Sequence, residues 1–101
     1  MQTTVTKEGA TAVIKLAGRF DFNAHREFRT AYDPLVVDTG VSAVLVDFSE
    51  VDYLDSSALG MLLMLRDKLG GVNKDVSLAG VKGNVKQVLD IANFGKLFKI
   101  S

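Results

Sequence analysis

The sequence contains no cysteine and only one histidine, His25. The absence of cysteine excludes disulfides, thiol catalysis and cysteine-based metal sites. Twelve lysine and arginine residues balance twelve aspartate and glutamate residues, and the basic residues form no long run. Without a basic cluster, the chain has no general attraction for nucleic acid or for an anionic membrane surface.

Long hydrophobic runs are also missing. The longest, residues 58–65, is interrupted by Gly60 and is far shorter than the ~20 residues that a membrane span needs. Residues 1–4 have neither the basic nor the apolar region of a signal peptide, so we expect a cytoplasmic protein. With 101 residues, 48% of them hydrophobic, the chain should form one domain, residues 1–101, around a sizeable core.

Hydrophobic periodicity predicts strands that alternate with helices. The predicted strands are residues 3–6, 11–17, 43–48, 76–79 and 96–100, and the predicted helices are residues 24–32, 57–69 and 85–92. Strands separated by helices imply an α/β fold with a largely parallel sheet. The third predicted strand is apolar at nearly every position, which predicts that it is covered on both faces.

Several residues are expected to mark the ends of these elements. Gly18 should end the second strand. Pro34 should either end the first helix at Asp33 or open one further turn. Residues 52–55 should form an acidic loop that leads into the second helix.

The most informative segment is Asp55-Ser56-Ser57, at the start of the second predicted helix. Hydroxyl and carboxylate oxygens meet free backbone N–H groups there, at the positive end of the helix dipole. The segment can be a simple helix cap. It can also hold an oxyanion, including a phosphate carried by one of the serines.

Two predicted strands deliver polar residues to the same edge of the sheet. Asp21 and Asn23 follow the second strand, and Asp55 and Ser56 follow the third. If these strands are parallel, the four side chains lie close together, because sites in α/β sheets gather at the carboxyl ends of the strands. They would form a small acidic patch that also carries a hydroxyl.

Catalysis has little support in the sequence. A serine nucleophile needs a general base, and His25 is expected to be a surface residue of the first helix. Asp47, Asp52 and Asp55 are candidate ligands for magnesium, but Asp47 lies inside a predicted strand and Asp55 already has a capping role. A phosphate-binding glycine loop is absent. We therefore expect neither an enzyme nor a metal site.

The second predicted helix is apolar almost all round. Its inward stripe is expected to consist of Ala58, Leu62, Leu65 and Leu69. Leu63 and Met64 fall near the opposite side of the helix. They either pack under a neighbouring helix or form an exposed docking surface.

Three segments of the chain form a recognisable set: residues 46–49 with 54–60, residues 18–21, and residues 93–100. Together they resemble the STAS domain of bacterial anti-sigma factor antagonists, and the resemblance covers essentially the whole chain. The motif Asp-Ser-Ser-x-Leu-Gly of residues 55–60 is fairly specific in this setting. Arg19 and Phe20 depart from the acidic–leucine pair that is commoner in the family, which would retune partner choice.

The resemblance implies a mixed sheet with helices packed mainly on one face. It also implies that Ser56, ahead of its rival Ser57, is phosphorylated by a partner that is both an anti-sigma factor and a serine kinase of the histidine-kinase-like ATPase type. A PP2C-type serine phosphatase would remove the phosphate. The unphosphorylated form would bind the partner and the phosphorylated form would release it. ATP would belong to the kinase, so we expect no cofactor.

The partner-binding surface expected from the motif and from the second helix consists of Asp21, Asn23, Asp55, Ser56, Ser57, Leu59, Leu63 and Met64. Two other functions stay open at this point. The target could be a regulator outside the sigma-factor system, for example one that governs biofilm or motility. Alternatively, the chain could be an accessory subunit of a transporter complex, which would not need a phosphorylatable Ser56. The terminal helix of many family members is missing, which would leave apolar surface for a partner or for a homodimer.

Overall fold

Five strands form one mixed sheet in the order β1-β2-β3-β4-β5, which is also their order in the chain. The computed structural model describes residues 1–101. β1 is antiparallel to β2, and all other neighbours are parallel, which confirms the predicted α/β fold. The strands are β1 (Gln2–Glu8), β2 (Thr11–Phe20), β3 (Ala43–Leu54), β4 (Asp75–Ala79) and β5 (Lys99–Ile100).

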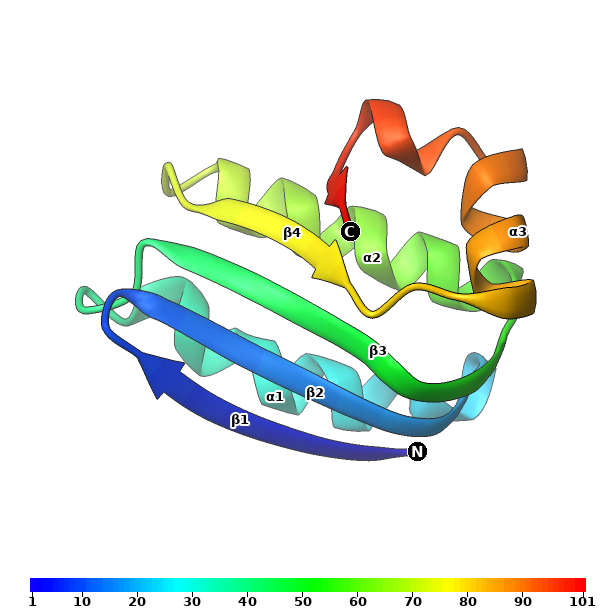
Figure 1. The fold of residues 1–101 in the computed structure, drawn as a ribbon. Helices are drawn as coiled ribbons and strands as arrows, with labels where there is room; N and C mark the ends of the chain where they lie inside the picture. Colours follow the sequence, from blue (N-terminus) through cyan, green and yellow to red (C-terminus); the bar gives the residue numbers. More distant parts are fainter.

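The helices lie on one side of this sheet. They are α1 (His25–Val37), α2 (Ser56–Gly70) and α3 (Gly83–Ile91), with two short 3-10 helices, η1 (Phe22–Ala24) and η2 (Phe94–Lys96). α1 and α2 run along the far face of the sheet in Figure 1, α3 stands at the end where β3 finishes, and the near face carries no helix. This confirms that the helices pack mainly on one face.

The prediction that the strand 43–48 is covered on both faces is wrong. Val44, Val46 and Phe48 point to the helices and are buried, whereas Leu45 on the other face is only half-buried. The cause is the position of the helices, since every crossover passes over the same face. A run of apolar residues therefore does not show whether a strand is covered by helices on both faces or on one face only.

The core consists of 24 buried residues, all apolar or aromatic. Phe20 is a fully buried member of this core at the end of β2, and its ring centroid is 4.9 Å from that of Phe28 and 6.1 Å from that of Phe48. These contacts join β2, α1 and β3. They fix the backbone at the carboxyl edge of the sheet, by which we mean the ends of β2 and β3 and the helix starts that follow them.

Two strands run further than predicted. β2 does not end at Gly18 but continues to Phe20, because Gly18 adopts a φ of +97° and the register with β3 shifts between Gly18 and Arg19. β3 continues to Leu54, so residues 52–54 belong to the strand rather than to an acidic loop. The last residues of β2 and β3 pair with each other, and this pairing stabilises the extension of both strands.

Two further boundaries differ from the prediction. α1 passes through Pro34 and ends only at Val37, because the burial of Leu35 beyond the proline offsets the missing backbone donor. The predicted strand 96–100 is reduced to Lys99–Ile100. Phe94 and Phe98 are both buried and stack with ring centroids 5.3 Å apart, and a spacing of four residues suits a helical turn rather than a strand.

Gly80 allows the loop after β4 to approach β3 closely. It has a φ of +69°, and a Cβ at this position would lie 2.7 Å from the backbone N of Ser49 and 2.8 Å from Oδ1 of Asp47. Asp47 in turn accepts a 2.9 Å hydrogen bond from the N–H of Ser49. This contact has room only for glycine.

We expect Gly80→Ala to lower the free energy of unfolding by at least about 2 kcal/mol, because it adds a left-handed alanine and a steric overlap with backbone. The matched control is Gly60→Ala, where a Cβ meets nothing within 4 Å and φ is not positive. Within α2 this control should instead stabilise the protein by about 1 kcal/mol. Urea unfolding of both variants checks the contrast, and equal shifts in the midpoint would contradict it.

The carboxyl end of α1 is held by a lysine from a distant loop. Nζ of Lys74, which precedes β4, donates hydrogen bonds to the carbonyl oxygens of Leu35 (2.6 Å), Val36 (3.0 Å) and Asp38 (2.7 Å). A cation at this position satisfies carbonyl groups that the helix leaves unpaired, and it lies at the negative end of the helix dipole.

We expect Lys74→Met to lower the free energy of unfolding by about 2 kcal/mol, since three carbonyl groups lose a charged donor. Lys96→Met removes the same charge from an exposed residue of η2 and should have almost no effect. Thermal and urea unfolding of both variants measure the difference. The interpretation is wrong if both proteins unfold at the wild-type midpoint.

Candidate functional site

The pairing of β2 with β3 places the two predicted acidic positions next to each other. Phe20 pairs with Leu54 in parallel register, and the N–H of Asp55 donates a 3.3 Å hydrogen bond to the carbonyl of Phe20. Asp21 and Asp55, each one residue further along, therefore leave neighbouring strands at the carboxyl edge. The structure thus brings together the segments that the sequence placed there.

Asp55 is the N-cap of α2. Its backbone is extended, with φ −111° and ψ −178°, and its Oδ1 accepts a 3.1 Å hydrogen bond from the N–H of Ala58. This cap leaves the N–H groups of Ser56 and Ser57 without a backbone acceptor. Two free donors thus remain in the first turn of the helix, where the dipole favours negative charge.

Ser56 is exposed as the first residue of α2, and Ser57 is half-buried. Ser56 begins an exposed stripe along the outer side of this helix, with positions three or four residues apart. The stripe consists of Ser56, Gly60, Met64 and Asp67. An enzyme from solvent can therefore reach the Ser56 hydroxyl without opening the fold.

The other predicted residues of α2 have different exposures. Ala58, Leu62, Leu65 and Leu69 are all buried, as predicted for the inward stripe, and Met61 joins them. Met64 has an exposed fraction of 42%. Leu59 and Leu63 are half-buried against the edge of the core. The outer side of the helix is thus partly apolar, and Met64 is its most exposed apolar side chain.

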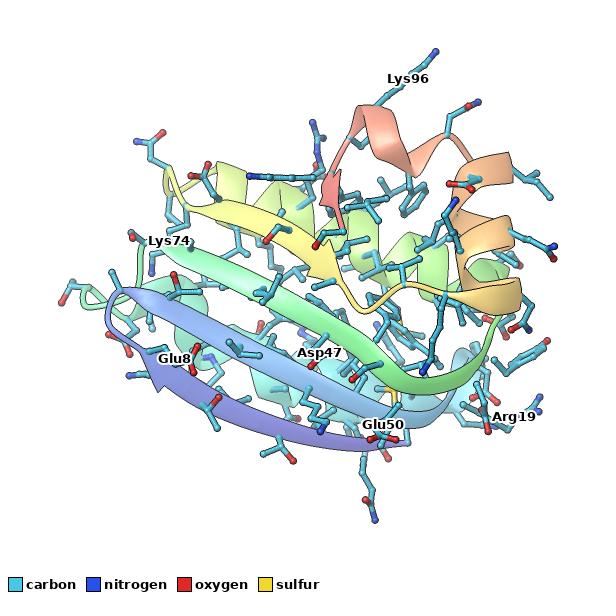
Figure 2. The ribbon with its side chains drawn as sticks, in the orientation of Figure 1. Glu8, Arg19, Asp47, Glu50, Lys74 and Lys96 are labelled. Carbon is cyan, nitrogen blue, oxygen red and sulfur yellow. The ribbon has the colours of Figure 1, made fainter.

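On the neighbouring strand, Asp21 caps η1 and accepts a 3.0 Å hydrogen bond from the N–H of Asn23, which is exposed. Nε of Arg19 lies 3.5 Å from Oδ2 of Asp21, and the guanidinium of Arg19 lies 4.0 Å from the centre of the Tyr53 ring. Arg19, labelled at the carboxyl edge in Figure 2, therefore lowers the net negative charge of the patch.

Sequence reasoning missed Phe22. This residue lies between Asp21 and Asn23, and its side chain has an exposed fraction of 73%. The signal was present, since a phenylalanine between two polar helix-start residues has no inward position to fill. η1 contacts α2, so an exposed aromatic ring belongs to the same edge as Ser56. Exposed aromatic residues are frequent anchors in protein interfaces.

The acidic residues do not assemble into a metal site. The chain holds no group of three or more histidine, cysteine, aspartate or glutamate side chains that could bind an ion together. Asp47 lies within the sheet rather than at its carboxyl edge (Figure 2), and its carboxylate is committed to Ser49. His25 is an exposed residue at the start of α1. None of the three helices is both long and apolar enough to cross a membrane.

An exposed serine thus begins α2 at the carboxyl edge of a mixed sheet. The model of the family described as "Mlab, STAS domain" matches residues 3–99. The chain belongs to the STAS-domain family.

This STAS domain is 48% identical over 94 residues to a STAS-domain containing protein of Pseudomonas aeruginosa. The alignment covers 93% of this chain and 91% of that protein. It is 29% identical over 65 residues to the candidate anti-sigma factor antagonist BtrV of Bordetella bronchiseptica, which covers 64% of this chain and 56% of BtrV. The second match is thus partial.

Among solved structures, the anti-sigma factor antagonist SpoIIAA in its unphosphorylated form has a TM-score of 0.76 at 21% identity, covering 99% of this chain and 87% of SpoIIAA. Bacillus SpoIIAA in its phosphorylated form has a TM-score of 0.75 at 20% identity, covering 99% and 91%. At this level of identity the likeness establishes a shared fold.

The role of Asp55 as a cap can be separated from its charge. We expect Asp55→Ala to lower the free energy of unfolding of the STAS domain by about 1 kcal/mol, because the N–H of Ala58 loses its side-chain acceptor. Asp55→Asn keeps an acceptor oxygen at the N-cap and should remain close to wild type. Urea unfolding tests both variants, and an equal loss in both would show that the charge rather than the hydrogen bond stabilises α2.

Proposed function

We propose that this STAS domain is an anti-sigma factor antagonist that is regulated by phosphorylation at Ser56 and has no catalytic activity of its own. The observation that carries the proposal is the position of Ser56. It is exposed, it begins α2, and the capping of that helix depends on Asp55 instead. The fold shared with SpoIIAA, which has been solved in both phosphorylation states, supports this function.

In the unphosphorylated form, the carboxyl edge and the outer side of α2 bind the partner. Asp21, Asn23 and Asp55 provide polar contacts, and Leu59, Leu63 and Met64 provide apolar area on α2. Ser57, which is half-buried, adds a hydroxyl to this proposed surface. The partner is an anti-sigma factor that is also a serine kinase of the histidine-kinase-like ATPase type, and it supplies the ATP.

Phosphorylation would add about −1.5 to −2 charges at Ser56, next to Asp55 and near Asp21. The free N–H groups of Ser56 and Ser57 and the helix dipole can accommodate this charge, so the fold stays intact. A partner surface that fits the unmodified serine closely would instead meet added volume and negative charge. The partner is released, and a PP2C-type serine phosphatase resets the domain.

We expect Ser56→Ala to keep the fold and to bind the partner permanently, because only the phosphate acceptor is removed. Ser56→Asp should weaken binding at least about tenfold through its added charge, which corresponds to about 1.4 kcal/mol. Ser57→Ala is the matched control for the phosphate acceptor, since it removes the adjacent hydroxyl and should still be phosphorylated at Ser56.

The measurement combines quantitative affinity capture from the native cell with mapping of the phosphorylated residue. Tagged wild-type and variant chains are compared for the same co-purifying kinase. Phosphate found on Ser57 alone, or equal capture by Ser56→Ala and Ser56→Asp, would refute the proposed switch. Capture of membrane transport components, with no kinase among them, would favour an accessory role in a transporter.

A further inference from the structure

We propose that two copies of this chain associate edge to edge through β1, in antiparallel orientation, and so join two five-stranded sheets into one continuous sheet. The proposal does not depend on the function of Ser56. It rests on the free edge of β1, on the shortness of the opposite edge, and on the self-complementary sequence of the strand.

β1 is bonded to β2 on one side and to nothing on the other. Figure 1 shows it as the outermost strand, with no helix or loop beyond it. Six of its seven residues are exposed, and its pairing with β2 runs without a bulge from Gln2 to Glu8. Every second residue of such a strand points unpaired N–H and C=O groups outward, ready to bind another strand.

The usual protections of an edge strand are absent from β1. It contains no proline and no glycine. Its only cationic residue, Lys7, forms an ion pair with Asp38 of the same chain, at the end of α1. Lys7 therefore does not guard the edge. The opposite edge, β5, has only two residues, too few to support a stable strand pair.

The sequence of β1 fits a second copy of itself. If both sheets keep their helices on the same side, an antiparallel pair must join residues that point to the same face. All seven residues pair only when Val5 lies opposite Val5. The remaining pairs are then Gln2 with Glu8, Thr3 with Lys7 and Thr4 with Thr6. Like charges are nowhere opposed, and two β-branched residues meet on the two-fold axis.

Val5 is the natural centre of this contact. Its exposed fraction is 39%, and it shares the helix-side face with Ile14, its partner on β2. Pairing with a second Val5 would remove an apolar side chain from water at the middle of the interface.

The dimer would leave the phosphorylation site free. α2 packs against α1 and β4, and β4 is three places from β1 in the sheet. Each dimer would thus present two copies of Ser56. A partner that is itself dimeric would bind both, with a gain in apparent affinity from the second, intramolecular contact.

The test uses the purified full chain and light scattering during size-exclusion chromatography. Wild type should move from the 10.9 kDa of one chain toward twice that mass as its concentration rises. Val5→Lys and Val5→Glu should each remain monomeric, because like charges face each other across the axis. An equimolar mixture of these two variants should recover the dimer.

Val72→Lys is the matched control, since Val72 is a valine of similar exposure, 45%, far along the chain from β1. It should dimerise as wild type does. Amide hydrogen exchange provides a second measurement, because alternate amides of β1 should become protected as the wild-type concentration rises. A wild type that stays monomeric up to millimolar concentration, or a dimer that survives both Val5 variants, overturns the proposal.

Discussion

The parallel pairing of the last residues of β2 and β3 is the constraint on which the candidate site depends. The hydrogen bond from the N–H of Asp55 to the carbonyl of Phe20 is the last bond of this pairing. On the helix side of the sheet, the ring of Phe20 packs against Phe28 of α1 and Phe48 of β3. Without that register, Asp21 and Asp55 would leave the sheet at different heights. The site is therefore positioned by backbone and core, and its exposed side chains are free to serve binding.

Asp55 and Ser56 have separate roles, so that the proposed phosphorylation of Ser56 is compatible with folding. Asp55 supplies the capping oxygen of α2, and Phe20 supplies the acceptor for the backbone of Asp55. The hydroxyl of Ser56 is thus left without a structural task. If the fold needed the hydrogen bonds of this hydroxyl, phosphorylation would destabilise the protein, because the partner atoms would lose their bonds. In the proposed function, stability would thus depend on Asp55 and signalling on the residue that follows it.

Much of this arrangement could be predicted from the sequence, because local chemistry determines it. The cap at Asp55 and the buried stripe of α2 follow from side-chain type and helical period. The extension of β2 beyond Gly18 could not be predicted in this way, since it depends on a partner strand 33 positions away, Gly18 pairing with Val51. The exposure of Phe22 was missed for a different reason: hydrophobicity alone predicts burial, whereas its place between two polar helix-start residues was the local signal for exposure.

The one-sided layering of the sheet gives its edges and faces different uses. With α1 and α2 on one face, the carboxyl edge carries the start of α2, whose first N–H groups are unpaired, which suits regulation by an anion. The β1 edge carries unpaired strand groups, which suit another strand. These two kinds of unsatisfied backbone point in different directions, because helix donors lie along the strand axis and strand donors lie across it. Self-association at one edge therefore does not compete with partner binding at the other.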